Sequence, residues 1–206
     1  MVPTRVNGVR CVIDTRVSQF TVQAFASGLG AAVARSPKIA IRDWTGEAQF
    51  DPGNPGDSSL RVRVKAASLE VLDEFRDDDR REIHRVMNKE VLESARYPEI
   101  VYESSEIRAE RLRDDVYRVT VRGRLTLHGV SNEHALVAQV ALGIDSARAY
   151  GEFTLRQSDY SIRIAPIAGG NLKLLDELKF SFYVVAREQG RGEFREPKRV
   201  DNGRLV

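Results

Sequence analysis

Apolar and polar residues alternate with a period of two along most of this chain. The alternation covers residues 18–24, 39–50, 60–66, 118–127, 151–156 and 179–184. In residues 60–66 the apolar positions are Leu60, Val62 and Val64, and the residues between them are basic. This pattern predicts β-strands with one buried and one exposed face. It favours antiparallel pairing, because the strands of a parallel sheet are usually apolar on both faces.

The number of strands limits the fold. About eight or more strands without an internal repeat are typical of a closed barrel or of a sandwich of two sheets. Long strands favour the barrel, and closure also pairs the edge strands that would otherwise recruit other chains. The fold class we expect is therefore mainly all-β, an extended antiparallel β-barrel.

One segment departs from the alternation. In residues 77–94 the apolar side chains of Ile83, Val86, Met87 and Val91 recur at helical spacing, and three aspartates stand at the start. Acidic groups at a helix N-terminus complement its exposed amides and its dipole. The segment predicts a short amphipathic helix between two strands, placed to cover one mouth of the barrel.

Composition narrows the class of protein. The chain has 206 residues, enough for one domain with a large core or a cavity. Its 32 basic and 30 acidic residues are interspersed, and the net charge of +2 does not indicate a nucleic-acid partner. Cys11 is the only cysteine, which excludes an internal disulfide, and we expect it to be a small buried or semi-buried thiol rather than a reactive one.

The N-terminal residues lack the apolar run of a secretory signal. No stretch approaches the roughly 18 apolar residues of a spanning helix. We therefore expect a cytoplasmic bacterial protein without stable membrane insertion. The sequence does not indicate whether it forms a homodimer.

The sequence offers few candidate catalytic residues. His84, His128 and His134 are the only histidines, and none lies in a metalloprotease-like arrangement. A two-histidine metal site with Glu133 is conceivable, but exposed turn histidines are the simpler interpretation. The polar residues that fall on the inward phase of strands are Ser68, Ser104 and Gln139. No base accompanies them, so we predict neither an enzyme nor a metal or cofactor site.

Four short motifs nevertheless occur in an informative order. Residues 125–131 read LTLHGVS, and residues 97–104 read YPEIVYES. Upstream of both stand Ile13-Asp14 with Ser18 and Phe20, and then the QFDP of residues 49–52. Together they resemble the YceI-like family of lipid-binding proteins, over about residues 10–187.

The resemblance implies a lipocalin-like barrel whose apolar bore holds a long isoprenoid or fatty chain. The barrel domain would span residues 10–188, between a flexible N-terminus at residues 1–9 and a flexible polar tail at residues 189–206. Small inward residues are expected to leave room along the axis: Gly46, Ala48, Ala66, Gly123, Ala141 and Gly151. Each CH₂ group buried in such a bore contributes about 0.8 kcal/mol.

The predicted ligand-binding residues are the larger apolar side chains on the inward phase. They are Phe20, Val22, Trp44, Phe50, Val62, Val64, Met87, Tyr102, Leu125, Phe153, Phe180 and Phe182. Arg80 and Arg85 on the helix are the predicted contacts for an anionic head group.

The function we expect is non-catalytic. The protein would bind and sequester, or carry, an isoprenoid, an isoprenoid quinone or a similar amphiphilic lipid. An alternative is a stress-related interaction protein with a filled barrel. A lipid hydrolase or isomerase would need two inward-facing catalytic groups, and the sequence offers no such pair.

Overall fold

The computed structural model of the chain describes residues 9–27, 37–51, 57–73, 76–144, 146–163, 166–167 and 172–189. The ends predicted to be flexible fall almost entirely on residues 1–8 and 190–206, which lie outside the described residues. The strands are β1 Val9–Ile13, β2 Gln19–Ser27, β3 Lys38–Ile41, β4 Trp44–Phe50, β5 Ser59–Lys65, β6 Leu69–Val71, β7 Glu99–Arg113, β8 Val116–Leu127, β9 Val130–Leu142, β10 Ser146–Arg156, β11 Pro166–Ile167 and β12 Leu172–Glu188.

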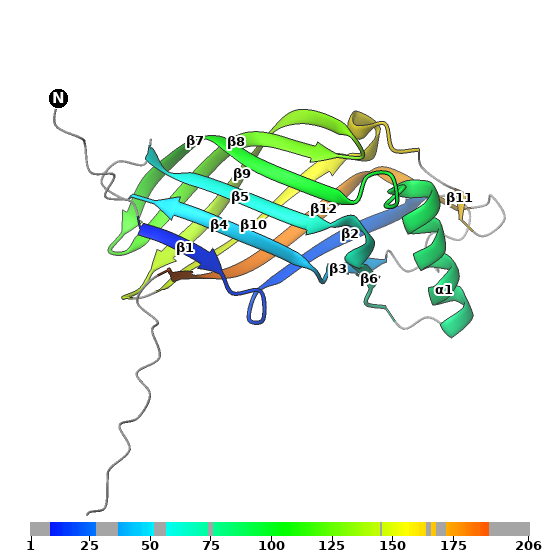
Figure 1. Cartoon of the computed structure of the whole chain (residues 1–206), viewed down its shortest axis with the longest axis horizontal. Helices are drawn as coiled ribbons and strands as arrows, with labels where there is room; N and C mark the ends of the chain where they lie inside the picture. The colour runs from blue at the N-terminus through cyan, green and yellow to red at the C-terminus, as the bar shows by residue number, and fades with distance from the viewer. Residues whose placement is uncertain are drawn as a thin grey trace, which may run out of the picture.

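Eight antiparallel strands form the wall of a barrel (Figure 1). Strands β1, β4, β5, β7, β8, β9, β10 and β12 follow one another in the sheet, and β1 also pairs with β12, which closes the ring. The barrel and the antiparallel pairing predicted from the alternation are therefore confirmed.

At one end of the barrel a second set of strands continues the wall. Beyond the residues that pair with β1, β12 pairs with β2, and β3 and β6 follow on β2. The predicted single strand over residues 39–50 is wrong in this respect, because it is divided into β3 and β4. The division lies at Arg42 and Asp43. The Arg42 amide donates to the Ser68 carbonyl in the 3₁₀ turn after β5, and the Asp43 carbonyl accepts the amide of Lys65 at the end of β5.

A helix covers the end of the barrel at which β3 and β6 lie. Helix α1, Asp77–Val86, lies across the right-hand end of the barrel in Figure 1. It is shorter than the predicted segment, because a π-helical turn, Met87–Val91, follows it. The three aspartates occupy its first turn as expected. Among the described residues, no helix is long and apolar enough to cross a membrane.

The alternation breaks where strands carry a bulge or inward polar residues. In β7 the register with β8 shifts between Ser104 and Glu106, which changes the phase of the inward side chains. In β9 the polar residues Asn132 and His134 share the phase of Leu136 and Ala138. For these reasons the pattern indicated neither the full length of β7 nor strand β9.

Of the small residues expected to leave interior space, Ala48 faces the interior as predicted, but others do not. Ala141 is exposed, so its predicted inward orientation is wrong. A β-carbon at Gly46 would meet the Ile13 side chain, and one at Gly151 would meet the Phe182 ring. Neighbouring side chains thus fill the space at both glycines.

The turn between β1 and β2 is hydrogen-bonded to β12. The Ser18 hydroxyl donates to the Asp14 carbonyl (2.7 Å) and accepts the Val185 amide (3.0 Å). The Asp14 carboxylate accepts hydrogen bonds from Arg16 and Arg187. The bond from Arg16, with a smaller contribution from Arg187, holds the pKa of Asp14 far below its ordinary value. These contacts explain why an acid and a serine stand at this spacing.

Replacing Ser18 with alanine is expected to lower the free energy of unfolding by about 1–3 kcal/mol, because the Val185 amide loses its acceptor. Urea unfolding measures the change. Ser105→Ala is the matched control, since the exposed Ser105 makes a single long bond to the Arg122 carbonyl (3.3 Å). Its effect should stay within about 0.5 kcal/mol. Equal losses in the two variants would contradict this role of Ser18.

Candidate functional site

The barrel encloses an apolar cavity of about 620 Å³, within the usual range for ligand pockets. Its wall contains residues from β1 to β10, from β12 and from α1. All of the predicted ligand-binding side chains line it: Phe20, Val22, Trp44, Phe50, Val62, Val64, Met87, Tyr102, Leu125, Phe153, Phe180 and Phe182. Their contact with a ligand stays a prediction.

Aromatic rings line one side of this bore. The rings of Phe153 and Phe180 are stacked at 4.7 Å, with 5° between their planes. The Phe20 ring presents an edge to both of them and to Trp44. Edge and stacked contacts of this kind add to the energy of simple burial.

Three polar side chains at the bore are Tyr102, Gln157 and His134, and the last two were not among the predicted site residues. The Tyr102 hydroxyl donates to the Val121 or the His134 carbonyl, each at 3.2 Å, and burial raises its pKa to about 12. The Gln157 amide donates to the Leu175 carbonyl. The His134 ring lies 5.1 Å from that of Phe153, and burial lowers its pKa.

His134 differs from the other two in its hydrogen bonding. Its Nε2 atom is buried and has no hydrogen-bond partner among the described residues. The interpretation of His134 as an exposed turn residue is therefore wrong. A signal in the sequence was present, because His134 shares the phase of Leu136 and Ala138.

His128 is also largely covered rather than exposed. Its side chain is only 10% exposed, its Nδ1 atom lies 3.3 Å from the Tyr160 carbonyl oxygen, and its ring contacts that of Tyr97 at 4.6 Å. Its backbone is left-handed (φ 52°), and Gly129 follows it with φ 74°. A β-carbon at Gly129 would run into the Tyr97 ring. These residues pack the turn between β8 and β9 against residues 93–97.

The two arginines predicted to bind a head group do not line the cavity. Arg80 is exposed on α1. Arg85 forms ion pairs with Glu82 (2.7 Å) and Glu90 (3.0 Å). Glu82 is the charged residue that lines this end of the bore, and the bond from Arg85 lowers its pKa.

The polar residues assigned to the inward phase form no common site. Ser68 bonds to the backbone of Asp43 and Lys65, and Gln139 accepts a hydrogen bond from the Tyr150 hydroxyl on the outer face. Ser104 accepts the Leu60 amide at the bulge of β7. In the described part of the chain, no three His, Cys, Asp or Glu side chains group as metal ligands would. Cys11 is half-buried, and burial raises its pKa.

Comparison with known proteins identifies the family. The model of the YceI-like domain matches residues 12–186. A relative from Pseudomonas savastanoi pv. phaseolicola, called a UPF0312 protein, is 32% identical over 131 residues, which are 60% of this chain and 62% of the relative. A UPF0312 protein of Pseudomonas syringae pv. syringae matches to the same extent. The chain thus spans less than two thirds of these relatives.

Solved structures share the fold at lower identity. BcnA of Burkholderia cenocepacia is 17% identical, with a TM-score of 0.64 over 84% of this chain and 98% of that one. A polyisoprenoid-binding domain from Saccharophagus degradans is 12% identical, with a TM-score of 0.60 over 88% and 99%. The YceI protein of Campylobacter jejuni is 20% identical, with a TM-score of 0.54 over 76% and 87%.

Acidification is expected to destabilise the fold through His134. Because burial lowers its folded pKa below the value of about 6.5 in an unfolded chain, the unfolded state binds more protons, and stability falls as the pH drops through about 6.5. Urea unfolding above and below this pH should show a smaller acid loss in His134→Phe than in the wild type. His84→Phe, on exposed helix surface, should behave as wild type. The same acid loss in all three proteins would contradict the assignment.

Proposed function

The chain belongs to the YceI-like family, and from this membership and its apolar bore we propose that it holds the hydrocarbon chain of an isoprenoid, an isoprenoid quinone or a similar amphiphilic lipid. Binding is non-covalent, and the protein sequesters or carries the molecule rather than changing it. The structural similarity to a polyisoprenoid-binding domain supports this class of ligand.

The observation that carries the proposal is the cavity itself. Its lining is almost wholly apolar, and it runs from Met87 and Leu92 beneath the helix to Phe50 and Leu60 in β4 and β5. An elongated apolar space suits a long chain, because each buried CH₂ contributes about 0.8 kcal/mol without needing a directed bond. The alternative of an interaction protein requires a filled barrel, and a cavity of about 620 Å³ argues against it.

A binding role also fits the polar groups at the wall. Tyr102 and Gln157 are engaged with backbone carbonyls, and the family and its structural neighbours favour a binding protein over an enzyme. Catalysis by general acid–base or nucleophilic groups needs a pair within hydrogen-bonding reach. The described wall of the bore presents Glu82, His134 and Tyr102 from α1, β9 and β7, and no hydrogen bond joins any two of these side chains.

The test begins with the purified protein. Solvent extraction and native mass spectrometry should recover a stoichiometric isoprenoid or fatty species. The delipidated protein should take up a prenyl quinone, and quenching of Trp44, the single tryptophan, reports the binding from the cavity wall. Val140→Trp should weaken uptake at least tenfold, because Val140 lines the bore and a larger side chain occupies the space of the ligand. Because this variant and its control each carry a second tryptophan, native mass spectrometry rather than quenching measures their uptake.

Ala141→Trp is the matched control. It introduces the same side chain at the next residue of β9, which is exposed, so it should bind the quinone as the wild type does. Circular dichroism checks that both variants are folded. An extract without lipid, together with failure to take up the quinone, would contradict the proposal that the protein carries a lipid. Equal binding by Val140→Trp and wild type would contradict it as well.

A further inference from the structure

The barrel wall is unpaired along part of one strand junction. Pairing between β9 and β10 runs from Leu142–Ala147 to Ala138–Gly151 and ends there. Both strands continue, β9 back to Val130 and β10 on to Arg156, while each stays paired with its other neighbour. Between residues 130–137 of β9 and residues 152–156 of β10, the two strands are not paired with each other. Side chains, rather than hydrogen bonds between these strands, separate the interior from solvent there.

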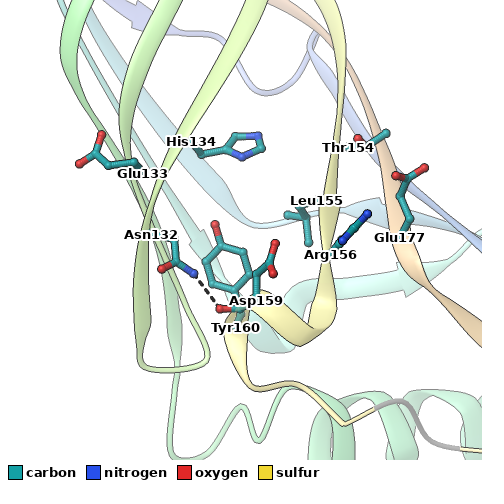
Figure 2. Close-up of a pocket in the computed structure, with 9 residues that line it drawn as sticks. All are labelled: Asn132, Glu133, His134, Thr154, Leu155, Arg156, Asp159, Tyr160 and Glu177. Carbon is teal, nitrogen blue, oxygen red and sulfur yellow. Dashed lines mark hydrogen bonds between the residues drawn. The ribbon is translucent and has the colours of Figure 1, made fainter.

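A pocket of about 650 Å³ occupies this junction (Figure 2). We call it the side opening, and its residues are Asn132, Glu133, His134, Thr154, Leu155, Arg156, Asp159, Tyr160 and Glu177. A 3₁₀ turn, Gln157–Tyr160, borders it, and the Asn132 amide donates to the Asp159 carbonyl (2.7 Å) at its edge. Figure 2 shows the Tyr160 hydroxyl directed toward the side on which His134 lies.

The side opening meets the apolar bore at two side chains. His134 from β9 and Leu155 from β10 line both spaces. In Figure 2 the His134 ring projects from β9 into the gap between the two strands. The two spaces are therefore adjacent, with these two side chains between them.

His134 supplies a hydrogen-bonding group at this point. Its buried Nε2 atom lacks a partner among the described residues, and an unsatisfied buried polar atom costs free energy. Burial lowers the pKa of the ring, so at neutral pH it is uncharged and offers one donor and one acceptor. Either a hydroxyl or a carbonyl can satisfy the free nitrogen.

The charges around the side opening disfavour an anion. Glu133, Asp159 and Glu177 line it against a single arginine, Arg156. Arg156 stands directly opposite Glu177 in the register of β10 and β12, and its charge also interacts with that of Asp176. The end of the bore at α1 is no better for an anion, because Glu82 lines it and Arg85 is paired with Glu82 and Glu90.

We infer that the side opening receives the uncharged polar head of the bound amphiphile, an alcohol or a carbonyl, through a hydrogen bond to Nε2 of His134. The inference rests on the proposed function, since it requires a chain in the bore. It places the head group between β9 and β10 rather than at Arg80 and Arg85 on α1.

Three probes with one chain and different heads test it. Farnesol carries a hydroxyl, farnesyl diphosphate carries an anion, and farnesene has no polar head. Quenching of Trp44 gives the affinity of the full chain for each. Farnesol should bind about five- to tenfold more tightly than farnesene, as one hydrogen bond predicts. The diphosphate should bind more weakly than farnesol.

Variants locate the head group. His134→Phe should lose the preference for farnesol and keep its affinity for farnesene, and His134→Leu provides a second, smaller replacement. The double variant Arg80→Ala, Arg85→Ala should bind all three probes as wild type does. In ¹⁵N-histidine NMR spectra, farnesol should shift the His134 Nε2 resonance more than farnesene does.

The outcomes separate the two proposals. Equal affinities of wild type for farnesol and farnesene, or an unchanged preference in His134→Phe, would overturn the side opening as the head-group site and leave chain binding intact. Tightest binding of the diphosphate, or loss of the farnesol preference in the arginine variant alone, would overturn it as well. Failure of every probe and of the prenyl quinone to bind would overturn the proposed function itself.

Discussion

Pairing of β12 along both of its edges is the constraint on which the rest of the barrel depends. One edge pairs through residues 177–187 with the full length of β10, and the other edge pairs first with β2 and then with β1. Because β1 and β2 lie one after the other along the same edge of β12, the chain must turn between them. Asp14 and Ser18 hold that turn against β12 through Arg187 and the Val185 amide. With the ring closed in this way, side chains alone decide whether the interior is filled.

The interior is partly empty because its side chains are distributed unevenly. An eight-stranded barrel is just wide enough to be filled by side chains or to hold one slim ligand. Here the large rings of Phe153, Phe180 and Phe20 gather on one side, and the facing strands contribute mainly valine and leucine. Glycines contribute little to the space, since Ile13 and Phe182 occupy the room beside two of them. The bore is thus a product of packing against an aromatic wall.

The sequence predicted the barrel, the helix at its mouth and the larger inward side chains, because these follow from periodicity and from family motifs. It failed where a periodic signal was interrupted by a local cause. The bulge at Ser104 changed the phase of β7, and inward polar residues concealed β9. The side opening was beyond prediction for a related reason. Where a strand pairing ends, here at Ala138 and Gly151, depends on neighbouring backbone and rings rather than on the pattern of either strand.

Several of the motif residues that identify the family have structural roles in the barrel. Ser18 fastens β1 and β2 to β12, and the left-handed pair His128 and Gly129 allows the turn after β8 to pack under Tyr97. These positions build the container. Other motif residues, such as Phe20, Phe50 and Tyr102, line the cavity, but most of the lining lies outside the motifs. A chain could therefore preserve every signature residue while exchanging the molecule it holds. Sequence signatures of this kind record common architecture, and differences in cargo must be sought among the unremarked residues of the lining.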